Sequence, residues 1–104
     1  MLNFEYPDSP DRLTCRFSGQ LTADKCALLS KLVEEEIAAL AAAHKTFTLI
    51  FDLEQVDYIS SAFLRICIAA AKQAGENNFS VINASPMIKK VFTVAGLETP
   101  LKVL

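Results

Sequence analysis

Most of the residue types that enzyme sites depend on are scarce in this sequence. Its 104 residues include one histidine, no tryptophan and three glycines. So few glycines exclude the glycine-rich loops that cradle phosphates. The single histidine, His44, falls at the end of an expected helix, where a solvated capping role is typical. With no nucleophile–base pair, paired carboxylates or metal-ligand cluster in the sequence, we predict a non-enzymatic protein without cofactor or metal.

Cysteines are also few, and they are far apart. Cys15, Cys26 and Cys67 are odd in number and form no CxxC pair. A disulfide framework needs pairs, and a metal cage needs clustered ligands. We therefore expect three reduced, mostly buried thiols in a cytoplasmic protein.

Neither sign of charge dominates, and no long apolar run is present. The formal net charge is −2, which gives no electrostatic attraction for nucleic acid or anionic lipid. No apolar run approaches the ~20 residues of a membrane-spanning helix, and MLNFEYPDSPD lacks the basic and apolar regions of a signal peptide. We expect a cytoplasmic protein that is not embedded in a membrane. The hydrophobic fraction of 52% suffices for one core over residues 1–104 and leaves room for a weak homodimer.

The strand signals come first in the chain and then alternate with helix signals. Apolar and polar residues alternate over 2–6 and again over 13–18, around a turn rich in proline and aspartate, which predicts a hairpin ending at Gly19. The runs at 46–53 and 79–83 predict buried strands, the first covered on both faces. The last four residues, 101–104, form a short strand or a packed tail.

Three segments show helical spacing. One helix is expected over 23–43 with Thr22 as its cap, a second over 62–74, and a third from Ser85-Pro86 to Gly96. The apolar stripes expected to face the core are Leu29, Leu32, Val33, Ile37 and Leu40; Leu64, Cys67, Ile68 and Ala71; and Ile88, Val91, Phe92 and Ala95. A hairpin followed by strand–helix alternation predicts an α/β fold, with one mixed sheet of four to five strands flanked by about three main helices.

Asp52 is the first candidate site residue. It falls near the carboxyl end of the strand expected at 46–53, where α/β folds place their sites. A phospho-acceptor aspartate would need further carboxylates for Mg²⁺ on a neighbouring strand end, and no acidic pair follows the earlier strands. The simpler interpretation, which we prefer, is that Asp52 hydrogen-bonds the turn after its strand.

Ser60 and Ser61 are the second candidates, where a loop meets the helix expected over 62–74. One serine there is a standard N-cap. The other leaves a hydroxyl free at the N-cap or first helical position, where the helix dipole favours a phosphoryl group of about −1.5 to −2 charge. A simple cap and a phosphorylation site that switches partner binding are therefore both open.

Three segments resemble the STAS domains, the bacterial anti-sigma-factor antagonists. DLEQVDYISSAFLR at 52–65 is similar to the family pattern D-L-x-x-V-x-[FY]-[IM]-[DS]-S-[AST]-G-L. FSGQLT at 17–22 is similar to its strand-ending G-x-L-D, and SPMIKKVF at 85–92, continuing to Leu97, is similar to its S-P-x-[VI]-[KR]-[KR]-[LV]-F…G-L stretch. The order and spacing of the three segments agree with the family, and the likeness covers nearly the whole chain.

The resemblance implies a STAS-like fold and a phosphorylation switch. In the family, the serine aligned with Ser61 is phosphorylated by a partner kinase that is also the anti-sigma factor. Phosphate abolishes binding of that kinase, and a separate phosphatase restores it. Ser61 is then the implied acceptor, with Ser60 less favoured, and the implied partner-binding residues are Thr22, Asp57, Tyr58, Ser60, Ser61, Phe63 and Arg65.

Two residues differ from the family pattern. Thr22 stands where an aspartate is usual, and Phe63 stands where a glycine is usual. We expect the Phe63 ring to project beside Ser61, where it could obstruct a kinase or provide an apolar contact. The alternative function is therefore a constitutive interaction subunit of a larger signalling or membrane-transport assembly, docked through Phe63 and without phosphorylation control.

Overall fold

Four strands form one mixed sheet in the order β1-β2-β3-β4. The computed structural model describes all residues, 1–104. The strands are β1 (Leu2–Glu5), β2 (Arg12–Leu21), β3 (Thr48–Ile59) and β4 (Phe79–Ile82). β1 pairs with β2 antiparallel, whereas β2, β3 and β4 run parallel. The hairpin and the mixed sheet predicted from the alternation are therefore confirmed.

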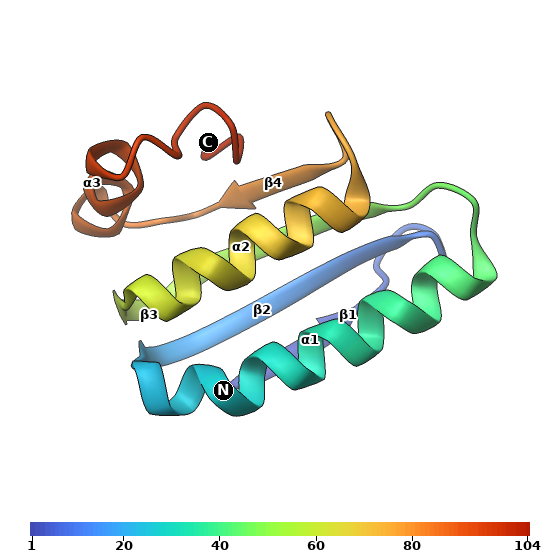
Figure 1. Ribbon diagram of the computed structural model, residues 1–104, viewed down its shortest axis with the longest axis horizontal. Coiled ribbons are helices and arrows are strands. Elements are labelled where there is room, and N and C mark those ends of the chain that lie inside the picture. Colours follow the sequence, from blue (N-terminus) through green and yellow to red (C-terminus); the bar gives the residue numbers. More distant parts are fainter.

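Three helices alternate with the parallel strands. They are α1 (Ala23–Ala43), α2 (Ser61–Ala74) and α3 (Pro86–Val94). α1 and α2 lie side by side on one face of the sheet, and α3 follows β4 at the end of the molecule where α1 and α2 begin (Figure 1). Each helix begins and ends within two residues of its expected position. None of the three is long and apolar enough to cross a membrane.

One apolar core of 26 buried residues joins the sheet to the helices. At its centre are four phenylalanines, one each from β2, β3, α2 and β4: Phe17, Phe51, Phe63 and Phe79. The ring centroids of Phe17 lie 5.0 Å from those of both Phe51 and Phe63, in edge-to-face contact. Such pairs add about 0.5–1.5 kcal/mol each beyond the burial of their area. These aromatic contacts fix how α2 lies on the sheet.

The opposite face of the sheet is not covered by helices, so the prediction that β3 is covered on both faces is wrong. Ile50 points to that face and remains half-buried. Its neighbours on β2 and β4, Thr14 and Ser80, are polar. Polar neighbours give a helix no apolar surface to bury, so this face carries no helix, although Thr14 and Asp52 on it are themselves buried.

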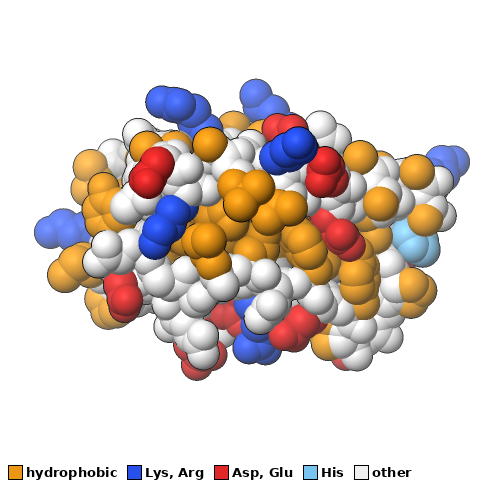
Figure 2. All heavy atoms as spheres, turned by 90° about the horizontal axis from the view of Figure 1, so that it is seen from below, with side chains coloured by type: hydrophobic (Ala, Val, Ile, Leu, Met, Phe, Trp, Pro, Cys, Tyr) orange, Lys and Arg blue, Asp and Glu red, His pale blue; other side chains and the backbone are white.

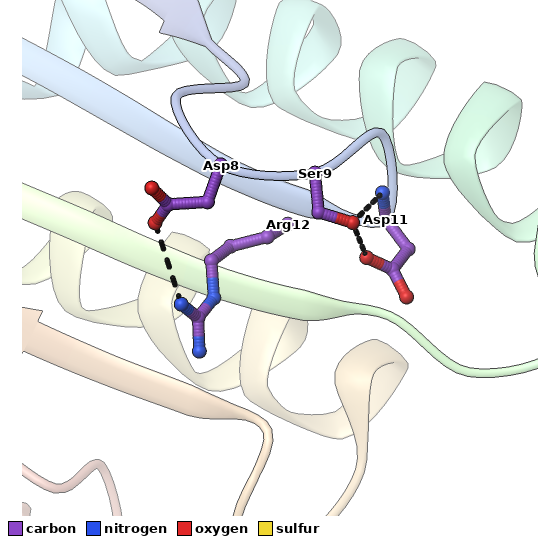
Figure 3. Close-up of polar contacts among 4 residues, drawn as sticks. All are labelled: Asp8, Ser9, Asp11 and Arg12. Atoms are coloured by element: carbon purple, nitrogen blue, oxygen red, sulfur yellow. Dashed lines mark hydrogen bonds and ion pairs between the residues drawn. The ribbon is translucent and has the colours of Figure 1, made fainter.

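The turn between β1 and β2 is held by polar side chains (Figure 3). An ion pair of 3.4 Å joins Arg12 to Asp8, and the hydroxyl of Ser9 donates to the carboxylate of Asp11. The bond from Ser9 lowers the pKa of the Asp11 carboxyl. The backbone carbonyl of Asp11 also accepts from Thr48 at the start of β3. The predicted turn chemistry is confirmed, and it also sets where β3 begins.

Both central strands are longer than predicted. β2 passes through Gly19 to Leu21, and β3 continues past Leu53 to Ile59. The pairing of β2 with β3 shifts register twice, once on either side of Ser18 and Gly19. Gly19 takes a φ of +86°, which only glycine adopts readily, and such bulges break the simple alternation of buried and exposed residues. The segment after Leu53 therefore looks like a polar link although it is a strand.

Three residues assigned to core-facing stripes, Leu32, Val91 and Ala95, lie on the surface instead. Leu32 on α1 is 36% exposed and Val91 on α3 is 37% exposed. The chain after α3 is buried: Leu101 and Val103 join the core, and Val103 forms a single parallel bridge with Val81 of β4. The last residues thus form a packed tail with one bridge.

Candidate functional site

The parallel strands bring three helix N-termini to one edge of the sheet. β2, β3 and β4 lead directly into α1, α2 and α3, whose N-cap residues are Thr22, Ser60 and Ser85. Parallel strands end at the same edge, so these caps lie at one end of the molecule, on the left in Figure 1. We call this end the carboxyl edge. Helix N-termini carry a partial positive charge and unpaired amides, so the edge favours negatively charged groups.

Pairing between β2 and β3 brings the first two sequence motifs together. Leu21 pairs with Ile59, and the backbone amide of Ser60 donates to the carbonyl of Leu21 at 3.1 Å. Thr22 follows Leu21 directly and is therefore beside Ser60. The Oγ of Ser60 also lies 3.8 Å from the Sγ of Cys26 in the first turns of α1. Thr22, Ser60 and Ser61 thus share one small area, as the resemblance implied.

The two serines occupy different helical positions. Ser60 is the N-cap of α2, and its carbonyl accepts from the amides of Phe63 and Leu64. Its hydroxyl makes no capping bond and faces Cys26. Ser61 is the first residue of α2; its side chain is exposed and has no hydrogen-bond partner within the protein. The hydroxyl of Ser61 is therefore open to a partner, while that of Ser60 is half-buried.

Thr22 caps α1 by position, without a capping bond from its side chain. Its hydroxyl donates to the carboxylate of Asp24 at 2.6 Å, and this bond lowers the pKa of Asp24. Although Thr22 replaces the aspartate usual in the first motif, Asp24 supplies a carboxylate two residues later. The edge therefore retains an acidic group near Ser60.

Three further predicted residues are exposed near the serines. Asp57 and Tyr58 lie at the end of β3, and Tyr58 is 50% exposed. Arg65 is exposed on α2, four residues after Ser61, which places the two side chains on the same side of the helix. Arg65 is thus the basic side chain of α2 nearest in sequence to the Ser61 hydroxyl.

The Phe63 ring does not project beside Ser61, although the sequence analysis predicts that it does. Its side chain is 0% exposed and packs between Phe17 and Phe51 in the core. On the third residue of a helix whose first residue faces solvent, the side chain points to the opposite side, toward the sheet. The ring therefore neither projects beside Ser61 nor offers a docking contact, and that prediction is wrong.

An exposed apolar surface adjoins Ser61, and the sequence interpretation missed it. It consists of Leu64 on α2 with Met87, Val91 and Val94 on α3, and we call it the α2–α3 surface. Met87 is 76% exposed and Val94 is 79% exposed. The signal was present: α3 carries a second apolar stripe at positions 87, 91 and 94, on the side away from Ile88 and Phe92. Exposed apolar surface of this kind is typical of protein contacts.

Comparison with known proteins agrees with the resemblance of the three sequence segments. A family model described as "Mlab, STAS domain" matches residues 4–104, almost the whole chain. The protein belongs to the STAS-domain family. No curated protein sequence is similar enough to count as a match.

Solved STAS-type structures superimpose over the whole domain. Unphosphorylated SpoIIAA, an anti-sigma factor antagonist, has a TM-score of 0.76 at 17% identity, covering 100% of this chain and 86% of its own. Phosphorylated SpoIIAA, a Bacillus cell-fate determinant, has a TM-score of 0.70 at 18% identity; the match covers 100% of this chain and 89% of that structure. An anti-sigma factor antagonist from Mycobacterium paratuberculosis has a TM-score of 0.77 at 18% identity; the match covers 99% of this chain and 85% of that structure. At such low identities these matches establish the fold.

Asp52 of this STAS domain lies inside β3 and not at its carboxyl end. The residue is 4% exposed and points to the helix-free face of the sheet, where it pairs with Arg16 at 3.9 Å. Its Oδ1 accepts from the backbone amide of Glu54 at 3.0 Å and from the side-chain amide of Asn83 at 3.2 Å. The preferred interpretation was right about the local hydrogen bond, but the bond lies in a bulge of the strand and not in a turn. The placement removes the reason for considering Asp52 as a phospho-acceptor.

Replacing Asp52 by alanine is expected to lower the free energy of unfolding by about 1–3 kcal/mol, because Glu54 and Asn83 lose their acceptor in a buried place. Asp52→Asn keeps an acceptor oxygen and should lower it by less. Urea unfolding followed by circular dichroism measures both. Equal losses for the two variants would show that the ion pair with Arg16, and not the hydrogen bonds, stabilises this part of the sheet.

Proposed function

We propose that this STAS domain is a non-enzymatic anti-sigma-factor antagonist. In its unphosphorylated form it binds a serine kinase that is also the anti-sigma factor, and phosphorylation of Ser61 ends the interaction until a phosphatase restores it. Both partners act in the cytoplasm. The binding surface comprises Thr22, Asp57, Tyr58, Ser60, Ser61 and Arg65, together with the α2–α3 surface.

The observation that carries this proposal is the position of the Ser61 hydroxyl. It is exposed, is not used in the capping of α2, and stands at the first residue of a helix at the carboxyl edge. A kinase can reach such a hydroxyl without unfolding the domain. Helix N-termini also stabilise phosphate, because their amides and their dipole favour negative charge. Arg65 supplies a cation on the same side of α2.

The same geometry supports a strong effect of phosphorylation on binding. Leu64 of the α2–α3 surface lies three residues after Ser61 and is its neighbour on the helix. A partner that packs on Leu64 and Tyr58 would bury the phosphate as well. Arg65 offers a single positive charge, so burying a phosphate of about −1.5 to −2 charge leaves part of that charge unpaired and opposes association. The phosphate therefore acts as a switch with little change in the fold.

A constitutive interaction subunit of a larger assembly is the second candidate. It is favoured by the α2–α3 surface, which is apolar whether or not Ser61 is modified. Docking through Phe63 is no longer part of this candidate, since that side chain is buried. The two candidates use the same surface and differ only in what a charge at position 61 does.

Affinity capture from lysate of the source organism distinguishes the candidates. The baits are the unchanged chain, Ser61→Glu, Ser61→Ala and Ala42→Glu. Ala42 is exposed near the far end of α1, so its variant adds the same charge away from the site. We expect a serine kinase to be retained by the unchanged chain, Ser61→Ala and Ala42→Glu, and its retention by Ser61→Glu to fall at least about tenfold.

Mass spectrometry identifies the retained proteins, and incubation with the retained kinase and ATP tests phosphorylation directly. Phosphate should appear on the unchanged chain and not on Ser61→Ala. A partner held equally by all four baits would contradict control at Ser61 and support the constitutive subunit.

A further inference from the structure

A second exposed apolar area lies on the opposite flank of α1, away from α2. On α1, Leu28 is 56% exposed and Leu32 is 36% exposed. On the edge strand β1, Leu2 and Phe4 are half-buried, and Tyr6 beyond it is 40% exposed. We call these five residues the α1–β1 flank. Figure 2, which views the molecule from the α1 side, shows hydrophobic side chains gathered in the middle of this face with charged side chains around them.

One hydrogen bond sets the register between α1 and β1. The hydroxyl of Tyr6 donates to the carboxylate of Glu36. Both α1 and β1 run opposite to β2, so they run in the same direction. Four residues of helix and two residues of strand each advance about 6–7 Å. Four residues before Glu36 on α1 and two before Tyr6 on β1, Leu32 therefore lies beside Phe4. One further step of the same size places Leu28 beside Leu2, so the flank is continuous.

Two opposite charges on this side of α1, those of Lys25 and Glu35, are placed symmetrically. The midpoint between Leu28 and Leu32 is residue 30, and Lys25 and Glu35 each lie five positions from it. At 100° per residue, all four side chains fall within an arc of about 80° on the helix. Both charged residues are exposed, and neither has an ion-pair partner in the chain. A surface with opposite charges at equal distances from its centre is complementary to itself under a two-fold rotation.

We propose that the α1–β1 flank is the contact surface of a two-fold symmetric homodimer. α1 runs antiparallel to α1 of the second copy, so that Leu28 packs against Leu32 of the other chain. Lys25 then faces Glu35 of the other chain, and the symmetry produces each contact twice. A standard interface buries about 800 Å² on each partner, a modest share of the 5972 Å² that the chain exposes. One flank of α1 and β1 supplies only part of that area, so we expect a reversible dimer in the micromolar range.

Sedimentation velocity of the full chain over a range of concentrations tests the dimer. We expect the unchanged chain to shift from monomer to dimer as its concentration rises. Leu28→Asp should raise the dissociation constant at least about tenfold, since two carboxylates would enter an apolar contact. Leu104→Asp is the matched control: its side chain is 63% exposed but lies beside β4, at the opposite edge of the sheet from β1, and it should leave the constant unchanged.

The charge pair gives a sharper test of the geometry. Lys25→Glu alone places like charges opposite each other and should weaken the dimer about two- to fivefold, as should Glu35→Lys. The double variant Lys25→Glu/Glu35→Lys restores the complementarity and should recover the original constant. All these positions are exposed, and thermal melts of each variant verify folding. A monomer at every concentration, a dimer insensitive to Leu28→Asp, or a double variant that fails to recover would each overturn the proposal. None of these outcomes bears on Ser61, so the proposed function is tested independently.

Discussion

Replacing Phe63 by alanine is expected to lower the free energy of unfolding by about 3–5 kcal/mol, the range for deleting a buried phenyl ring. The ring is fully buried and contacts both Phe17 and Phe51. Small domains are stable by only about 5–15 kcal/mol in total, so the variant should lose a large share of its stability. Urea unfolding followed by circular dichroism measures the change.

The glycine variant makes this prediction specific to the present chain. Glycine is the usual residue of the STAS pattern at this position, yet Phe63→Gly should be at least as damaging as Phe63→Ala, with up to about 1 kcal/mol more from the helix propensity of glycine. Phe63→Leu keeps most of the apolar volume and should lose clearly less than either. If Phe63→Gly were neutral, the ring could not be what fixes α2 on the sheet.

The sequence predicted the order of elements well, because each local signal agreed with the fold. Thr22, Ser85 and Gly75 all stand at the helix boundaries where capping rules place them. The bulges between β2 and β3 were not predictable, since a register shift depends on the neighbouring strand and not on the strand's own residues. That is why the pattern predicts a strand that ends at residue 53, although β3 continues to Ile59.

The candidate site was predicted in part, and the failures have a common cause. The sequence pattern predicts that Ser60 and Ser61 lie at a helix N-terminus, because the start of a helix depends on local residues. Whether Phe63 faces the partner or the core depends on what α2 packs against, and three other phenylalanines fill that space. The α2–α3 surface likewise arises from two helices that are far apart in sequence, so a motif on one of them could not reveal it.

Raising the pH above about 9 is expected to destabilise the protein steeply. Burial raises the pKa of the Cys15 thiol from 9.0 to about 12, and burial also raises the pKa of Cys67 well above its ordinary value. Partial burial and the bond to Glu36 raise the pKa of Tyr6 to about 12, and this adds to the effect. Below about pH 9 the thiols keep their protons in both the folded and the unfolded states, and pH has no effect through them.

Between about pH 9 and pH 12, only the unfolded chain releases these protons, so the free energy of unfolding falls as the pH rises. Each thiol contributes up to about 1.4 kcal/mol per pH unit, which for Cys15 amounts to about 4 kcal/mol over the whole interval. Urea midpoints measured at increasing pH test this slope. Cys15→Ala is the matched variant: it starts less stable because of the space left in the core, but it should lose less with rising pH, so its curve approaches that of the unchanged chain. If the two curves fell in parallel, the Cys15 thiol would have the same pKa in the folded and the unfolded chain, and the alkaline loss would have to come from other groups. The same result would mean that water reaches this thiol on β2, whose neighbour on β1 is Phe4 of the flank on which the proposed dimer depends.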